Sequence, residues 1–157
     1  MTFAIADSLL TAYATNNRIN VYLIQNVPEE AWHGKLDPKK GRHIAAIAAH
    51  MHNVRLMWLK AIGKTPALPA KLDRADCTKE EVIRAFEESY QAVEAVLRAA
   101  LESDGRVKGF KPDAGGFLAY LLAHEAHHRG QICMLARQLG HPLPQSAMFG
   151  MWEWGTR

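Results

Sequence analysis

The sequence has few cysteines and no long apolar run, and both absences narrow the class of protein. Only Cys77 and Cys133 occur among 157 residues, too few for the disulfide framework of a small secreted protein. Neither is placed like a metal ligand. No stretch approaches the roughly 20 apolar residues of a membrane span, and Asp7 interrupts the apolar run that a signal peptide would need. We therefore expect a cytoplasmic protein without a membrane partner.

The sequence also lacks any concentration of charge of one sign. The formal net charge is +3, and the 19 lysines and arginines are scattered. They form no basic stripe interleaved with aromatic residues, which argues against a nucleic-acid partner. Apolar residues make up 48% and charged residues 22% of the chain, as in ordinary globular proteins. This length and composition predict one domain over residues 1–157.

No segment alternates between apolar and polar residues like a strand, whereas four segments repeat apolar residues at helical spacing. The predicted helices cover residues from about 2 to 26, from about 43 to 62, from 78 to at least 97, and from about 113 to 139. Thr78 followed by Glu81 is a capping box, and Asp113 is a suitable N-cap. Gly63, followed by Pro66, ends the second helix.

Helices of this length must bury their apolar faces against one another, so the predicted fold is an all-α four-helix bundle. The 15-residue link from Gly63 to Cys77 is long enough, at about 3.3 Å per residue, to run along a neighbouring helix. As a crossover it would make the second and third helices parallel. The 16-residue link from Val27 to Arg42 could do the same. Only the short turn before the fourth helix requires an antiparallel pair.

Three histidines have the placement of metal ligands. His124 and His128 are four residues apart, so they lie on one helical face with Cβ atoms about 5–6 Å apart, and both rings can reach one ion. His50 is the natural third ligand, because it lies on the apolar face of the second predicted helix. Three neutral imidazoles suit Zn²⁺, Ni²⁺ or Fe²⁺ and leave positions open for water or substrate. The sequence predicts one divalent ion here.

Two alternatives remain open from spacing alone. His127 lies three residues from His124 and could replace His128 as the second ligand. The three histidines could also be core residues satisfied by hydrogen bonds. Because each unpartnered buried imidazole would cost about 1–3 kcal/mol, we favour metal binding. The remaining histidines are interpreted as surface or capping residues: His33, His43, His52 and His141.

The segment from His124 to His128 also fits the pattern of two histidines around a general-base glutamate that is typical of zinc proteases. The longer form of that pattern requires Gly and His downstream, where this chain has Gln131 and Met134. No predicted strand is available to hold an extended peptide. We interpret the match, including Glu125, as accidental.

A resemblance to a known family rests on several stretches of sequence. The chain resembles the DinB-like (DinB/YfiT-like) metal-binding four-helix family. The family's second helix is similar to GRHIAAIAAHMHNVRLMWL, with a His eight residues before a Trp-Leu pair, and its last helix is similar to HEAHHRGQICMLARQLG. Weaker similarities are found in TNNRINVYLIQNVPEEAW and GHPLPQSAMFGMWEWG. The resemblance places the family's three metal ligands at His50, His124 and His128.

The resemblance implies an activity as well as a fold, because relatives include bacillithiol transferases and a mycothiol-dependent maleylpyruvate isomerase. A low-molecular-weight thiol would be deprotonated at the metal and attack an electrophile. We interpret the chain as a metal-dependent thiol S-transferase with a small-molecule substrate, assembled as a homodimer. The alternatives are a hydrolase using metal-bound water and a non-catalytic metal or small-ligand binding protein.

The sequence offers candidates for residues that would assist the metal ligands, and it identifies no catalytic residue. Gln131 and Tyr120 lie on the face of the histidines and are candidates for orienting the ligands or the substrate. Asn16 or Asn20 would serve as polar partners across the bundle. Ordinary buried hydrogen bonding is an equally good interpretation of all four.

Overall fold

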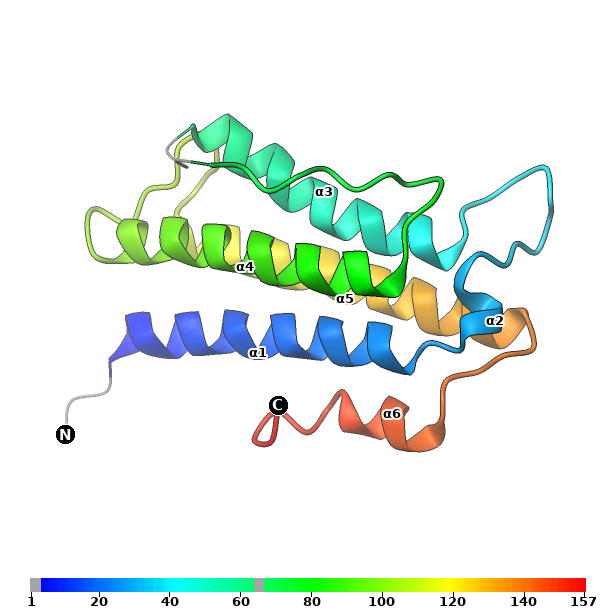
Figure 1. The fold of residues 1–157 in the computed structure, drawn as a ribbon. Helices are drawn as coiled ribbons and strands as arrows, with labels where there is room; N and C mark the ends of the chain where they lie inside the picture. The colour runs from blue at the N-terminus through cyan, green and yellow to red at the C-terminus, as the bar shows by residue number, and fades with distance from the viewer. Residues whose placement is uncertain (1–3, 64–66) are drawn as a thin grey trace.

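The computed structural model describes residues 4–63 and 67–157, which form six helices and no strand (Figure 1). The helices are α1 (Ile5–Asn26), α2 (Glu29–Trp32), α3 (Ile44–Ile62), α4 (Lys79–Leu101), α5 (Ala114–Gln138) and α6 (Gln145–Gly150). The four long helices confirm the all-α class. The expected start of the first helix at Thr2 lies outside the described residues. The short helices α2 and α6 were not predicted, because four and six residues are too few to establish a period.

The long helices form a bundle in which α1 and α5 run in one direction and α3 and α4 in the other (Figure 1). The described part of the link between α3 and α4, residues 67–77, runs back along the bundle, which confirms the predicted crossover. The link between α1 and α3 stays at one end of the bundle and contains α2, so these two helices are antiparallel. Each of α1 and α3 contacts both α4 and α5.

The helix starts show why the sequence folds where it does. Thr78 and Glu81 form both halves of the predicted capping box, with Thr78 N 2.8 Å from Glu81 Oε2 and Glu81 N 3.2 Å from Thr78 Oγ1. Asp113 Oδ1 accepts from the N–H of Gly116 at 2.8 Å. Gly63 ends α3 with a φ of +70°, a conformation that glycine adopts at little cost. Pro66 lies outside the described residues.

The predictions for two histidines other than His50, His124 and His128 have different outcomes. His43 caps α3, because its Nδ1 accepts from the N–H of Ala46 at 3.1 Å, so its capping role is confirmed. The interpretation of His52 as a surface or capping residue was wrong. Its side chain is 0% exposed, and its Nε2 lies 2.9 Å from the carbonyl oxygen of Ala70. His52 therefore holds the crossover against α3, a contact that the helical period alone does not reveal.

The core has an apolar cluster toward each end of the bundle, with a buried polar layer between them. The cluster nearer α2 includes Trp32, Ile44, Phe86 and Ile132. The cluster at the other end includes Leu10, Leu59, Leu97 and Phe117. The polar layer consists of Asn16, Asn17, Asn20, Arg55, Ser89 and Glu125, none of which is more than 1% exposed. All four long helices thus contribute to one polar level.

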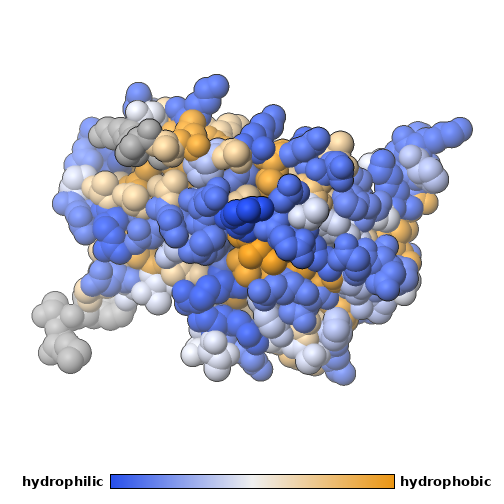
Figure 2. All heavy atoms as spheres, viewed as in Figure 1, coloured by the Kyte–Doolittle hydropathy of each residue, from blue (hydrophilic) through white to orange (hydrophobic). Residues whose placement is uncertain are grey.

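The surface is largely hydrophilic on the side drawn in Figure 1. Figure 2 shows charged and polar side chains over most of that face, with apolar atoms in separate small areas. Scattered exposed apolar residues are normal and require no partner. Within the described residues, no helix is both long enough and apolar enough to cross a membrane.

Candidate metal centre

The structure brings His50, His124 and His128 together between α3 and α5. One ring nitrogen from each lies within 4.8 Å of the other two. Among the described residues, these three side chains form the group of His, Cys, Asp or Glu that could hold a metal ion. Nε2 of His124 is 3.1 Å from Nε2 of His128. Nitrogens around a tetrahedral zinc ion, each about 2.0–2.1 Å from the metal, lie about 3.3 Å apart. The spacing of these two rings therefore fits a shared ion.

Gln131 fixes the orientation of one ring in the cluster. Its Oε1 is 2.7 Å from Nδ1 of His128, and because a carbonyl oxygen only accepts, this contact is a hydrogen bond when the ring carries its proton on Nδ1. The lone pair is then on Nε2, the atom that faces His124. A metal-binding histidine commonly donates its other ring N–H to an oxygen in this way.

Burial keeps the three rings neutral, which is the form that binds metal. It lowers the pKa of His50 to about 4, and the neighbouring His128 and His124 contribute in the same direction. Burial likewise lowers the pKa of His124 and that of His128. At neutral pH the cluster therefore presents unprotonated nitrogens.

Tyr120 covers the cluster on one side. Its ring stacks on that of His124, with centroids 5.9 Å apart and planes inclined by 18°. Tyr120 in turn contacts Trp58 and Phe110, with ring centroids 5.6 and 5.5 Å away. These aromatic rings form an apolar wall toward the N-terminal end of α5.

Asn20 lies elsewhere, in the polar layer around Glu125. The Nδ2 atoms of Asn16 and Asn20 each lie 2.6 Å from Oε2 of Glu125. Arg55 pairs with the same carboxylate through two bonds, Nε to Oε1 at 2.7 Å and Nη2 to Oε2 at 2.9 Å. Nη1 of Arg129 reaches the side-chain oxygens of both asparagines. The asparagines are thus polar partners across the bundle, but in this layer and not around the histidines.

The charge of Glu125 is fully compensated inside the protein. Burial acts to raise its pKa, but the charge and hydrogen bonds of Arg55, together with the amides of Asn20 and Asn16, outweigh burial and hold the pKa below its usual range. Arg55 also donates to Asn17 Oδ1 at 2.9 Å and to the carbonyl of Phe86 at 3.0 Å. Both carboxylate oxygens are occupied, so Glu125 is not available as the general base of a protease.

Arg55 was not predicted from the sequence, although a signal was present. Arg55 follows Met51 and Val54 on the buried side of α3, and a charged residue within an apolar stripe requires a buried partner. Its partner Glu125 was noticed only within the protease pattern. His127, the competitor of His128, is exposed. Its ring lies 5.0 Å from that of His128 but outside the group of three.

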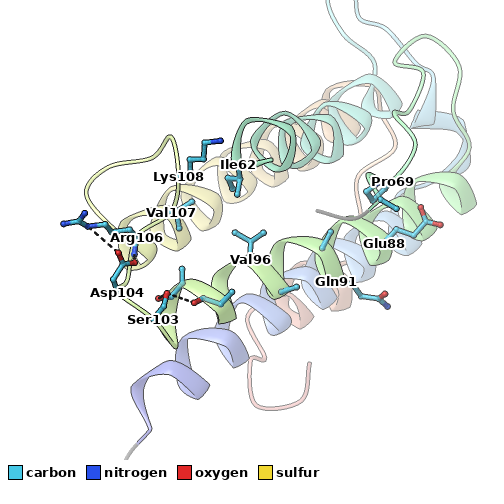
Figure 3. A pocket seen from close by; sticks show the side chains of 15 residues that line it. Ile62, Pro69, Glu88, Gln91, Val96, Ser103, Asp104, Arg106, Val107 and Lys108 are labelled. Carbon is cyan, nitrogen blue, oxygen red and sulfur yellow. Dashed lines mark hydrogen bonds and ion pairs between the residues drawn. The ribbon is translucent and has the colours of Figure 1, made fainter. Parts of the chain in front are cut away.

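Two hollows on the surface of the described residues bear on the site. One, of about 550 Å³, lies between α4, the crossover and the link before α5, with Ile62, Val96 and Val107 among its lining and Arg106 at its rim (Figure 3). It contains none of the histidines. The other, of about 540 Å³, is lined by His128 and lies beside the cluster. The hollow drawn in Figure 3 is therefore separate from the candidate metal centre.

Comparison with known proteins agrees with the geometry. The model of the DinB family matches residues 2–155, nearly the whole chain. No curated protein matches this sequence. A family match of this extent covers all four long helices and all three clustered histidines. The chain therefore belongs to the DinB family.

Proposed function

We propose that the chain binds one divalent metal ion through His50, His124 and His128 and transfers a low-molecular-weight thiol to an electrophile. The observation that carries this proposal is the meeting of three neutral imidazoles, with the lone pair of His128 Nε2 directed at His124 by the contact of Gln131 with Nδ1. Imidazole is a good ligand for Zn²⁺, Ni²⁺ and Fe²⁺. The three imidazoles therefore fit a divalent ion but do not distinguish among these three metals.

A bound ion would supply Lewis acidity that lowers the pKa of a thiol beside it. In the overall reaction the thiol proton passes to solvent, a sulfur–carbon bond forms, and the leaving group departs with its electron pair. Among this chain's residues, Gln131 holds His128 in place, and Tyr120 with its aromatic neighbours keeps water from one side of the cluster.

The surroundings of the cluster favour thiol transfer over hydrolysis. No carboxylate among the described residues joins the three histidines, and the neighbouring Glu125 is held by Arg55, Asn16 and Asn20. A hydrolase benefits from a positioned base near the attacking water. A thiol that ionises at the metal requires no such base.

A conjugation assay tests the transferase proposal. Metal-loaded protein would be incubated with bacillithiol, mycothiol, glutathione or cysteine and a halogenated electrophile, and product formation compared with the rate without protein. We expect acceleration with at least one thiol, its loss in His128→Ala, and its retention in the matched variant His141→Ala, whose side chain is exposed. Rates equal to the spontaneous reaction for every thiol would remove the basis for the proposal.

The homodimer and the cytoplasmic location remain predictions. Phe149 on α6 is 64% exposed and Trp152 just after it is 79% exposed, which would suit a contact between two copies. Light scattering of the purified protein should give twice the mass of one chain. If the wild-type protein and Trp152→Ser both gave the mass of a single chain, the dimer would be contradicted.

A further inference from the structure

The hollow beside the metal centre has a distinctive lining. It lies between the start of α3 and the C-terminal half of α5, and His128 and Gln131 form part of its wall. Arg42 and His127 are its other titratable or charged residues, and Ile47 and Leu135 provide apolar surface. No carboxylate of the described residues lines it. At about 540 Å³ its volume is in the range of small-molecule sites.

Arg42 has no partner among the described residues. The structure gives it no hydrogen bond or ion pair with those residues, and its side chain is exposed. Arg42 and His128 line the same hollow, so the guanidinium lies on the side of the cluster where the hollow is.

The local charge balance at the cluster is positive. Arg74 also contributes to the lowered pKa of His50, after burial, the two neighbouring histidines and Arg42. The negative charge that reaches His124 and His128 is that of Glu125, and it is already paired with Arg55. A guanidinium that is always charged, beside a hollow without carboxylates, is suited to bind an anion through two parallel hydrogen bonds.

We infer that the hollow lined by Arg42, Gln131 and His128 binds a carboxylate of the small thiol substrate. This inference rests on the proposed function, because it assigns the substrate class of the same centre. Arg42 pairs with the carboxylate, and the apolar surface of Ile47 and Leu135 contacts the carbon chain that joins the carboxylate to the sulfur. The thiols selected are therefore anionic, and neutral thiols of similar size bind more weakly.

Calorimetry with capped thiols tests the inference without relying on activity. The probes are S-methylglutathione, whose sulfur no longer ionises, and its diethyl ester, which lacks the carboxylates. Each is titrated into wild-type protein, Arg42→Glu and Arg106→Glu, with metal content measured on the same samples. Arg106→Glu is the matched control, because it makes the same change of charge at the rim of the separate hollow in Figure 3.

We expect the acid to bind wild-type protein at least about tenfold more tightly than the ester, since a charge-assisted bond is lost with the ester. Arg42→Glu should remove this difference while retaining metal, and Arg106→Glu should preserve it. Equal affinities for acid and ester, or an unchanged preference in Arg42→Glu, would overturn the inference. A preserved preference in protein that binds no metal would support the anion site while contradicting the proposed function.

Discussion

His124 and Glu125 are neighbours in the chain, yet they belong to two regions of opposite character. The Glu125 side chain is 0% exposed, and both its oxygens are bonded to groups of the same chain. The His124 ring is only half-buried and, with His50 and His128, presents nitrogens that face one another. The oxygens of Glu125 are satisfied by groups of the same chain, whereas the histidine cluster presents ring nitrogens that could hold an ion.

The polar layer joins the helices of the bundle, whereas the histidine cluster is the proposed functional site. A buried ion pair often contributes little net stability relative to apolar residues, but removing one partner is costly. The pair of Arg55 and Glu125 joins α3 to α5, the two helices that carry His50 and the other ligands. We interpret the polar layer as the feature that sets the mutual register of these helices, and the cluster as the functional site.

The largest effect is expected from breaking the buried pair. Glu125→Ala would leave the Arg55 guanidinium charged and unpaired in the core, and should lower the free energy of unfolding by about 3–5 kcal/mol. Urea unfolding of the metal-free protein measures this loss in the free energy of unfolding. If Glu125→Ala does not fold, the milder variant Glu125→Gln is measured instead. Glu94→Ala, which removes a part-exposed pair with Arg98, should cost at most about 1 kcal/mol. Equal losses in Glu125→Ala and Glu94→Ala would contradict the special cost of breaking the buried pair.

A smaller and different effect is expected at the edge of the cluster. Gln131→Ala removes the acceptor that orients His128 and should weaken metal binding by about 10–100-fold. Because the Gln131 side chain is exposed, the free energy of unfolding of the metal-free protein should change by less than about 0.5 kcal/mol. Competition with a chromophoric chelator gives the affinity, with Arg137→Ala as a control on the same helix. Wild-type affinity in Gln131→Ala would show that the contact has no positioning role.

The smallest effect concerns pH. The pKa of His50 is lowered to about 4 in the folded protein, against about 6.5 in an unfolded chain. Between these values the unfolded chain binds more protons, so the free energy of unfolding of the metal-free protein should fall as pH decreases from about 6.5 to about 4. The pKa of Glu125 is also lowered, so its contribution to stability is lost below the unfolded value of about 4.3, at the lower end of this window.

The matched variants for this pH effect are His50→Gln and His141→Gln. Urea unfolding across the window should show a shallower dependence on pH for His50→Gln, and the wild-type dependence for His141→Gln, whose side chain is exposed in a loop. Identical slopes in all three proteins would mean that His50 titrates normally in the fold.

Much of the fold could be predicted because it depends on local signals. Helical periodicity located four helices, and Thr78 and Asp113 marked two starts through bonds to residues only three positions away. The cluster was also predictable in part, since four residues of spacing put His124 and His128 on one face. The position of His50 opposite them required a non-local inference, and the structure brings the three rings together.

The features that sequence reasoning missed depend on partners far apart in the chain. Arg55 and Glu125 are separated by 70 positions, so the place of Arg55 within an apolar stripe indicates a buried partner but does not identify it. His52 is buried because the crossover lies over it. The 16-residue link after α1 and the 15-residue link after α3 are nearly equal in length, yet only the second crosses the bundle.

Metal content per chain tests the central claim most directly. Purified wild-type protein, His50→Ala, His124→Ala and His127→Ala would be loaded with Zn²⁺, desalted and analysed by mass spectrometry of the elements. We predict about one ion per chain for the wild-type protein and for His127→Ala, and almost none when a member of the cluster is removed. Full occupancy in His50→Ala or His124→Ala would contradict the three-histidine centre.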